Sequence, residues 1–165
     1  PKNRLSIETL AISVKKIRKL LDKLAEQMSE GQQVYWVCPL IEENENKHLS
    51  NSNDRFLYLR NEFSQFKVGL IHGQMPSEDK ESELKKFNER KIDILVSTTV
   101  IEVGIDNPNA TAIVIENANR FGLSQLHQLR GRVGRGDKKS YCFLVYDGNL
   151  SDQACLLYTS PSPRD

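Results

Sequence analysis

Five short apolar runs, each of four to six residues, set the strongest limit on how this chain folds. The runs are nearly continuous, whereas a strand with one solvated face would alternate apolar and polar residues. Continuous runs indicate strands that are buried on both faces, as in a parallel sheet covered by helices on each side. The runs are VYWVC (34–38), VGLI (68–71), IDILV (92–96), AIVI (112–115) and YCFLVY (141–146).

Helical segments are expected between these runs. Apolar residues recur at steps of three and four from Leu10 to Met28, which predicts an amphipathic helix that Gly31 ends. A second helix is expected over 54–66, and a third begins near Pro76. Residues 42–55 are rich in asparagine and predict an exposed loop. Strands that alternate with helices predict an α/β fold with three layers and a mostly parallel sheet.

The chain divides into three parts by sequence character. Residues 1–32 are expected to form a lead-in linker with the amphipathic helix, and residues 33–151 hold all five strand candidates. Residues 152–165 end in LLYTSPSPRD, which is rich in serine and proline and lacks any helical or strand periodicity. We therefore expect a main domain over 33–151, followed by an irregular tail of flexible or non-native character.

Charge and cysteine content exclude several classes of protein. The net charge of +1 over 165 residues gives no general attraction to nucleic acid, but residues 120–139 hold six Lys or Arg against Asp137, a local charge of +5. Cys38 and Cys142 lie inside apolar runs and are expected to be reduced core residues. No Cys or His spacing suggests a metal site, and no apolar stretch is long enough to cross a membrane. A cytoplasmic protein with no membrane association is expected.

Polar and glycine residues follow two of the strand candidates. In open α/β sheets, chemistry gathers in the loops beyond the carboxyl ends of the strands. Thr98 and Thr99 follow one strand and could donate to phosphate oxygens, and His72 with Gly73 could do so after another. Further along the first of these loops, Gly104 permits close approach of a ligand, and Asp106 could accept from a ribose hydroxyl. Taken alone, both stretches are equally compatible with ordinary turns before helices.

The stretch QLHQLRGRVGRG, residues 125–136, interleaves arginines with glycines. An arginine fork neutralises a phosphate bidentately and keeps its charge at any working pH. Arg132 and Arg135 would share a face if the segment were helical, and Gly131 and Gly134 leave room beside them. Clustered arginines repel one another, so an anion between them would relieve that cost. The alternative is a solvated basic loop, which does not require glycines at this spacing.

These motifs, in this order, resemble the second RecA-like motor domain of superfamily 2 helicases. The stretches YWVCPLIEE, VIEVGIDNPNA and ENANRFGLSQLHQLRGRVGRG are similar to the RecG family of bacterial ATP-dependent DNA helicases. The resemblance runs from about residue 1 to 151. It implies a RecA-like, P-loop NTPase-type domain that acts in remodelling branched DNA and stalled replication forks during DNA repair and recombination.

The resemblance implies a role in ATP hydrolysis for five residues. Gln128, Arg132 and Arg135 match helicase motif VI, in which the two arginines act as fingers that reach the ATP γ-phosphate. Gly104 and Asp106 match the part of motif V that faces the nucleotide. Arginine fingers stabilise the charge that develops in phosphoryl transfer.

The resemblance also implies contacts to nucleic acid. Thr98 and Thr99 match the part of motif V that touches the nucleic-acid backbone. His72 and Gly73 match a motif that lies along the same nucleic-acid strand. Arg120 leads into motif VI and is expected to couple the nucleotide to the DNA. Contacts of this kind are independent of base sequence and sensitive to salt.

Two helicase motifs are not found in these 165 residues. There is no GxxxxGK[ST] phosphate loop and no DExH acidic box. The resemblance therefore implies that ATP and Mg²⁺ are held mainly by an N-terminal RecA-like domain of the same full-length chain, which also carries a wedge domain for branched DNA. We expect this chain to be half of an ATPase and to be inactive alone.

Two other functions stay open at this point. A transcription-repair coupling factor shares the motif near 128–135, and a domain that binds RNA polymerase upstream would favour it. A non-catalytic nucleic-acid-binding module would explain the local charge of +5 without any nucleotide, but it leaves Asp106 and the paired glycines unexplained.

Overall fold

The computed structural model describes residues 7–38, 45–98, 107–133 and 138–148. These residues hold six strands and four α-helices, with two short 3-10 helices. In chain order they are β1 (Ile7–Ser13), η1 (Val14–Lys16), α1 (Ile17–Ser29), β2 (Gln33–Val37), α2 (Glu45–Glu62), β3 (Val68–Ile71), α3 (Ser77–Asn88), β4 (Ile94–Ser97), β5 (Ala110–Ile115), η2 (Ala118–Arg120), α4 (Leu123–Arg130) and β6 (Ser140–Tyr146).

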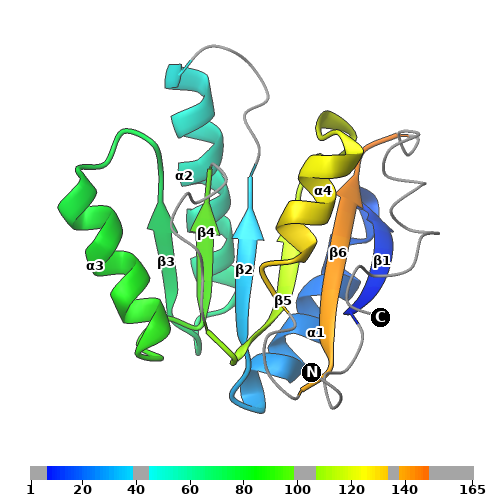
Figure 1. Cartoon of the computed structure of the whole chain (residues 1–165), viewed down its shortest axis with the longest axis horizontal. Coiled ribbons are helices and arrows are strands. Elements are labelled where there is room, and N and C mark those ends of the chain that lie inside the picture. The colour runs from blue at the N-terminus through cyan, green and yellow to red at the C-terminus, as the bar shows by residue number, and fades with distance from the viewer. Residues whose placement is uncertain (1–6, 39–44, 99–106, 134–137, 149–165) are drawn as a thin grey trace.

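The six strands form one sheet in the order β1-β6-β5-β2-β4-β3 (Figure 1). Each neighbouring pair in this order is parallel. All strands therefore begin at one edge of the sheet, called here the amino edge, and end at the other, the carboxyl edge. The mostly parallel sheet expected from the apolar runs is confirmed.

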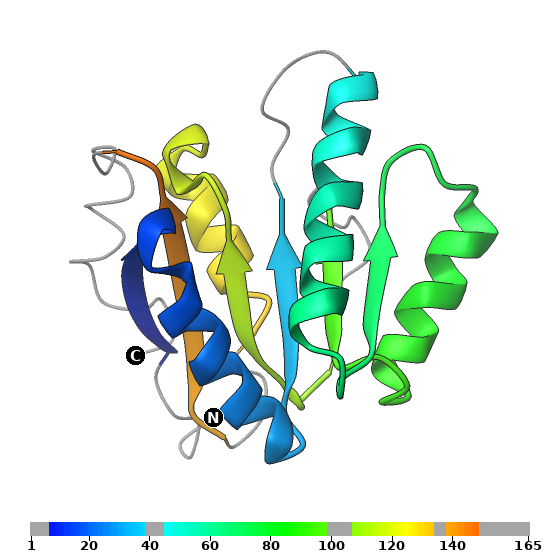
Figure 2. The same cartoon turned by 180° about the vertical axis from the view of Figure 1, so that it is seen from behind.

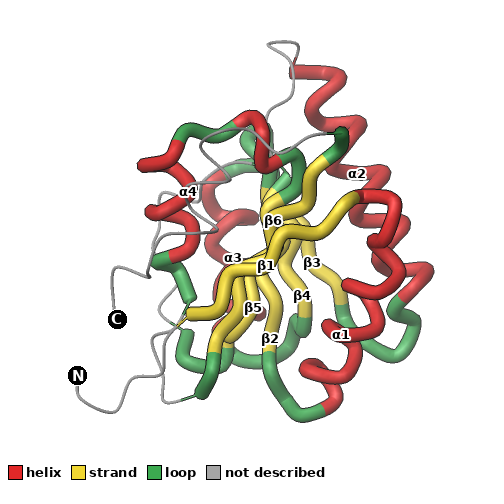
Figure 3. Tube along the Cα trace, turned by 90° about the vertical axis from the view of Figure 1, so that its right-hand side faces the viewer, coloured by secondary structure: helices red, strands yellow, loops and turns green. Residues whose placement is uncertain are grey.

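Helices cover both faces of the sheet, as the uninterrupted apolar runs require. Helices α3 and α4 lie on one face (Figure 1), and α1 and α2 lie on the other (Figure 2). An edge-on view shows the resulting three layers (Figure 3). Within β2, Tyr35 and Val37 point into the core shared with α3 and α4, while Val34 and Trp36 point into the core shared with α1 and α2. This alternation explains why every residue of β2 is buried.

Two sequence expectations about secondary structure were wrong. Residues 7–13 form the edge strand β1 and not the start of a helix, and α1 begins only at Ile17. Leu10 fitted the helical spacing by chance. The strand β1 reads IETLAIS, so polar residues interrupt it and it lacks the continuous apolar run of the other strands. Helix α2 begins at Glu45, inside the predicted loop. Buried Leu59 lies near its far end, and buried Phe63 directly follows the helix. The first turns carry no apolar stripe that could have indicated a helix.

Candidate active site and nucleic-acid edge

His72 and Thr98 lie together at the carboxyl edge of the sheet, where β3 and β4 end. The backbone amide of Thr98 donates to the carbonyl oxygen of Ile71 at 3.2 Å, which ties the two strand ends together. His72 Nδ1 accepts from the amide of Gln74 at 3.3 Å, so that Nε2 carries the proton of the neutral ring. A Cβ at Gly73 would meet no atom within 4 Å, so the fold itself does not require glycine there.

Thr98 is more enclosed than the sequence suggested. Its side chain is buried, and its hydroxyl has no hydrogen-bond partner among the described residues. A buried hydroxyl without a partner is uncommon, because desolvating it without a bond costs free energy. An acceptor that reaches the carboxyl ends of β3 and β4 would satisfy this hydroxyl.

Four of the predicted site residues, Thr99, Gly104, Asp106 and Arg135, lie outside the described residues. For Arg120 the structure describes the backbone in η2 only. The roles expected for these five residues stay predictions.

Gln128 and Arg132 are carried by α4 and the turn that follows it. Leu126 and Leu129 face the core, whereas Gln128 is exposed on the outer side of the helix. The helix ends at Arg130, and the amide of Arg132 donates to the carbonyl of Leu129 at 3.0 Å. The helical spacing that would have placed Arg132 and Arg135 on one face therefore does not continue beyond the end of α4.

Buried neighbours hold the turn that carries Arg132. Val133 is 1% exposed and lies in the core with Leu129. Arg130, also 1% exposed, donates from Nη1 to Thr9 Oγ1 on β1 at 3.0 Å, and its Nη2 lies 3.2 Å from His127 Nδ1. Arg132 itself is partly exposed between these two anchors. The turn thus fixes the backbone while leaving the Arg132 side chain at the surface.

Arg130 is a core residue, which the sequence did not reveal. It was counted in the local charge of +5, but its guanidinium bonds to other elements inside the fold. Burial, followed by the charge of Arg130, lowers the pKa of His127, which favours the neutral imidazole that can accept from the guanidinium. The signal that could have found it is the position of Arg130, one residue after Leu129 and four after Leu126, next to the apolar face of the helix.

The structure separates the predicted residues into two places. His72 and Thr98 are at the carboxyl edge, but Arg132 follows the far end of α4, on the way to the amino edge where β6 begins (Figure 1). Arg132 therefore lies away from the strand-end loops that hold His72 and Thr98. The reason is topological, because a parallel β6 can start only after the chain has crossed back along α4.

A buried carboxylate, Glu116, was missed by sequence reasoning. It directly follows β5 at the carboxyl edge and is 7% exposed. Its Oε2 accepts from Trp36 Nε1 at 2.7 Å and from Cys38 Sγ at 3.1 Å, and Arg55 of α2 binds both carboxylate oxygens, at 3.0 and 2.6 Å. An acidic residue right after a fully apolar strand was the available signal.

Electrostatics within this group follow from the buried ion pair. Burial lowers the pKa of Arg55, but the charge and the hydrogen bonds of Glu116 outweigh burial and raise that pKa above its ordinary value. Burial raises the pKa of the Cys38 thiol well above its usual range, and the charge of Glu116 raises it further. Burial also raises the pKa of Cys142 to about 12. Cys38 and Cys142 are free, buried thiols, as the sequence predicted.

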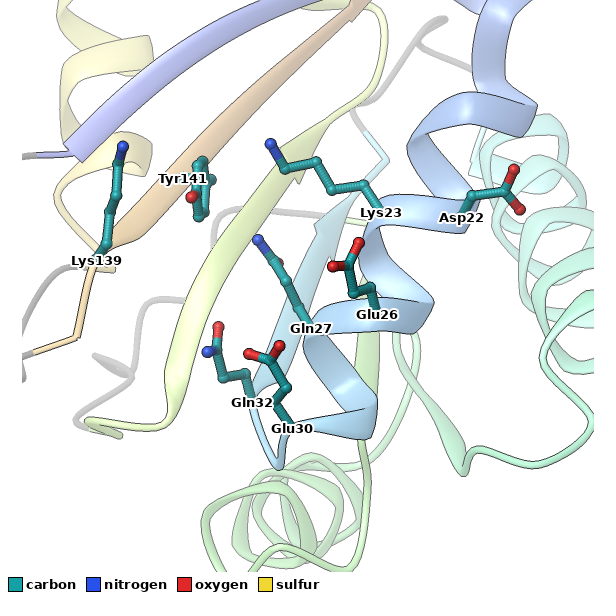
Figure 4. Close-up of a pocket in the computed structure, with 8 residues that line it drawn as sticks. All are labelled: Asp22, Lys23, Glu26, Gln27, Glu30, Gln32, Lys139 and Tyr141. Atoms are coloured by element: carbon teal, nitrogen blue, oxygen red, sulfur yellow. The ribbon is translucent and has the colours of Figure 1, made fainter.

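A polar groove on the face opposite α4 contains none of the predicted site residues (Figure 4). Lys23 of α1 reaches over the ring of Tyr141 in β6, with its Nζ 4.5 Å from the ring centroid. The lining residues are Asp22, Lys23, Glu26, Gln27, Glu30, Gln32, Lys139 and Tyr141. Carboxylates and ammonium groups are mixed along it, so the groove is not selective for one sign of charge.

Among the described residues, no helix has both the length and the apolar character needed to cross a membrane.

Comparison with known proteins places the chain in a family. The model of the helicase conserved C-terminal domain matches residues 14–137. The ATP-dependent DNA helicase RecG of Synechocystis sp. is 47% identical over 153 residues, covering 92% of this chain and 18% of that protein. RecG of Streptococcus pneumoniae is 50% identical over 146 residues, covering 88% of this chain and 22% of its own length. The chain thus spans about a fifth of the length of these relatives.

Solved structures agree with the sequence comparison. A RecG structure bound to a three-way DNA junction superposes with a TM-score of 0.78 at 41% identity, covering 94% of this chain and 20% of that one. The second helicase domain of the DEAD-box protein Mss116p, bound to an RNA duplex, gives a TM-score of 0.64 at 20% identity and supports the RecA-like fold. The chain therefore belongs to the helicase conserved C-terminal domain family, and over most of its length it is similar to RecG helicases.

Proposed function

We propose that this chain is the second motor domain of an ATP-dependent, RecG-type DNA helicase that remodels branched DNA. The observation that carries the proposal is the turn after α4, where buried Arg130 and Val133 hold the partly exposed Arg132 next to the outward face of Gln128. In a RecG-type chain, a partly exposed guanidinium on a fixed backbone suits contact with a phosphate on another domain. Its RecG relatives are bacterial proteins, and we propose the bacterial cytoplasm as its location.

The described residues fit one half of an ATP site that two domains share better than they fit a complete ATP site. No group of three or more metal-ligating side chains occurs within the described ranges. The side-chain donors of Gln128 and Arg132 are instead suited to stabilising negative charge on a triphosphate that another domain holds with Mg²⁺. When bound between the two domains, ATP would supply the phosphoryl group that is transferred to water. Arg132 would then neutralise charge, and Gln128 would help to orient the reacting groups.

The carboxyl edge supports the DNA-binding half of the proposal. His72 and Thr98 lie there, away from Arg132, so the two ligands would approach different parts of the domain. Donors that meet the sugar-phosphate backbone give binding that does not depend on base sequence. The RecG relative solved on a three-way junction suggests branched DNA as the ligand. The partners within the full-length protein would be the N-terminal motor domain and the wedge domain.

The isolated 165-residue chain is expected to show no Mg²⁺-dependent ATP hydrolysis above background. No sequence in it matches a phosphate loop or an acidic box, so nothing cradles the triphosphate. The test is phosphate release by the purified chain with and without branched DNA, beside the full-length helicase as the positive control. Mg²⁺-dependent ATP turnover by the isolated chain itself would contradict the proposed division of the ATP site between two domains.

His72→Ala in the full-length helicase is expected to weaken DNA-stimulated turnover and to leave basal turnover unchanged. Loss of one hydrogen bond to a charged phosphate should raise the DNA concentration for half-maximal stimulation about tenfold. The measurement is ATPase rate against concentration of a branched DNA. Gln74→Ala is the control, because Gln74 is an exposed residue of the same turn. Equal loss of basal and stimulated rates would place His72 in the nucleotide site.

A further inference from the structure

The buried ion pair of Glu116 and Arg55 stands between the two proposed binding places. Glu116 is at the carboxyl edge, where His72 and Thr98 lie, and its amide donates to the carbonyl of Val37 at 3.0 Å. The chain then runs through Asn117 and η2 directly into α4, at whose far end Arg132 is held. The backbone of residues 117–122 therefore connects Glu116 to the start of α4, the helix that carries Gln128 and is followed by the turn with Arg132.

The contacts of Glu116 join three elements that are far apart in the sequence. Trp36 and Cys38 come from the end of β2, and Arg55 comes from α2. The Arg55 guanidinium also lies over the rings of Trp36 and Tyr58, at 5.7 and 5.1 Å from their centroids. A planar fork that is bidentate to a carboxylate and stacked on two rings has little freedom to rotate. The pair thus holds α2, β2 and β5 in one arrangement at this edge.

Packing alone does not require a charge at this position. Ala118 and Phe121 already anchor the segment between Glu116 and α4 in the core. Hydrophobic residues of similar volume often replace a buried ion pair with no loss of stability, because burying charges costs solvation free energy. A buried pair with this many directional bonds is better explained by the geometry that it imposes.

We infer that Glu116 and Arg55 are positioning residues that hold the segment leading into α4, and so align Arg132 when DNA occupies the carboxyl edge. This inference rests on the proposed function, since it assigns the pair to the coupling of the two sites. Neither residue touches nucleotide or DNA in this role. Both act through the backbone of residues 116–122 and through α4.

Glu116→Gln in the full-length helicase tests the inference. The amide removes the charge and replaces an acceptor oxygen by a donor that faces Trp36 or Arg55. We expect kcat for DNA-stimulated ATP hydrolysis to fall about tenfold, the range of a modest coupling free energy. The KM for ATP should stay nearly unchanged, because the triphosphate is held by the other domain. Measurements are made well below the unfolding midpoint of each variant.

Two further variants sharpen the result. Arg55→Lys keeps the positive charge but loses the bidentate fork, so a partial loss of kcat is expected, and adding it to Glu116→Gln should cost little more. Glu62→Gln is the matched control, because Glu62 pairs with Arg18 between α2 and α1 in an exposed ion pair away from this edge. That variant should keep the wild-type kcat.

The outcomes separate this inference from the proposed function. A lower unfolding midpoint with wild-type kcat in both Glu116→Gln and Arg55→Lys would show a purely structural role and overturn the inference. If Glu116→Gln does not fold, the unfolding midpoint and the kcat of Arg55→Lys alone decide whether the role is purely structural. Arg132→Ala is measured beside them. If Arg132→Ala loses turnover while Glu116→Gln and Arg55→Lys keep the wild-type kcat, only the inference is overturned. If Arg132→Ala keeps normal turnover, the proposed function is overturned, and the inference with it.

Discussion

Replacing Arg132 by alanine in the full-length helicase should lower ATP turnover by about 10³-fold, which corresponds to roughly 4 kcal/mol of transition-state stabilisation. The guanidinium is proposed to neutralise charge that develops on the transferred phosphoryl group, and alanine leaves that charge without a partner in a site from which water is excluded. Affinity for nucleotide should change little, because binding depends on the first motor domain. Single-turnover hydrolysis and nucleotide titration measure the two effects separately.

Two variants serve as controls for this result. Lys138→Ala removes an exposed positive charge a few residues beyond the same turn and should leave turnover unchanged. Arg132→Lys keeps a point charge without the planar fork and should recover part of the activity. If Arg132→Ala retained wild-type turnover, or if Lys138→Ala lost as much as Arg132→Ala, the role proposed for Arg132 would be wrong.

Replacing Arg130 by alanine should instead unfold the domain more easily, although Arg130 is only two residues from Arg132. The side chain is 1% exposed and bonds to Thr9 on β1 and to His127. Truncation leaves a cavity between α4 and the edge strand and removes the bond that joins them. We expect the free energy of unfolding to fall by about 3 kcal/mol, and the midpoint of thermal unfolding to fall by roughly 10 °C. Circular dichroism against temperature and urea measures both for the 165-residue chain.

Arg130→Met separates the two causes of this loss. Methionine fills much of the same volume without the hydrogen bonds, so it should cost less than half as much as alanine. Arg132→Ala in the same chain should lower the midpoint by less than Arg130→Ala does, since Arg132 is partly exposed. An unchanged midpoint for Arg130→Ala would show that the guanidinium contributes nothing to holding α4 against β1.

The inner strands could be predicted from sequence because nearly all of their residues are apolar. The runs around Tyr35, Leu95 and Ile113 lie in β2, β4 and β5, with both faces covered. The edge strand β1 and the first turns of α2 could not be predicted in the same way. Polar residues interrupt the apolar residues of β1, and the Asn-rich start of α2 has no apolar stripe, so neither element has the pattern that signals burial.

The candidate site was only partly readable from sequence. The motifs named His72, Thr98, Gln128 and Arg132, but they did not show that Arg132 lies at the other end of α4 from the carboxyl edge. Glu116 was missed because its partners Trp36 and Arg55 are 80 and 61 residues away along the chain. A contact of that range has no periodic signature in the sequence.

The amino-acid sequence by itself determined the fold class and the family, because both depend on local patterns of apolar residues and on short motifs. Only the tertiary structure decided which of two nearby arginines is buried and which faces outward, since that depends on where α4 meets β1. It also decided that Glu116, directly after β5, pairs with Arg55 of α2. The physical reason is that hydrogen bonds and burial between distant segments exist only once the parallel sheet has brought those segments together.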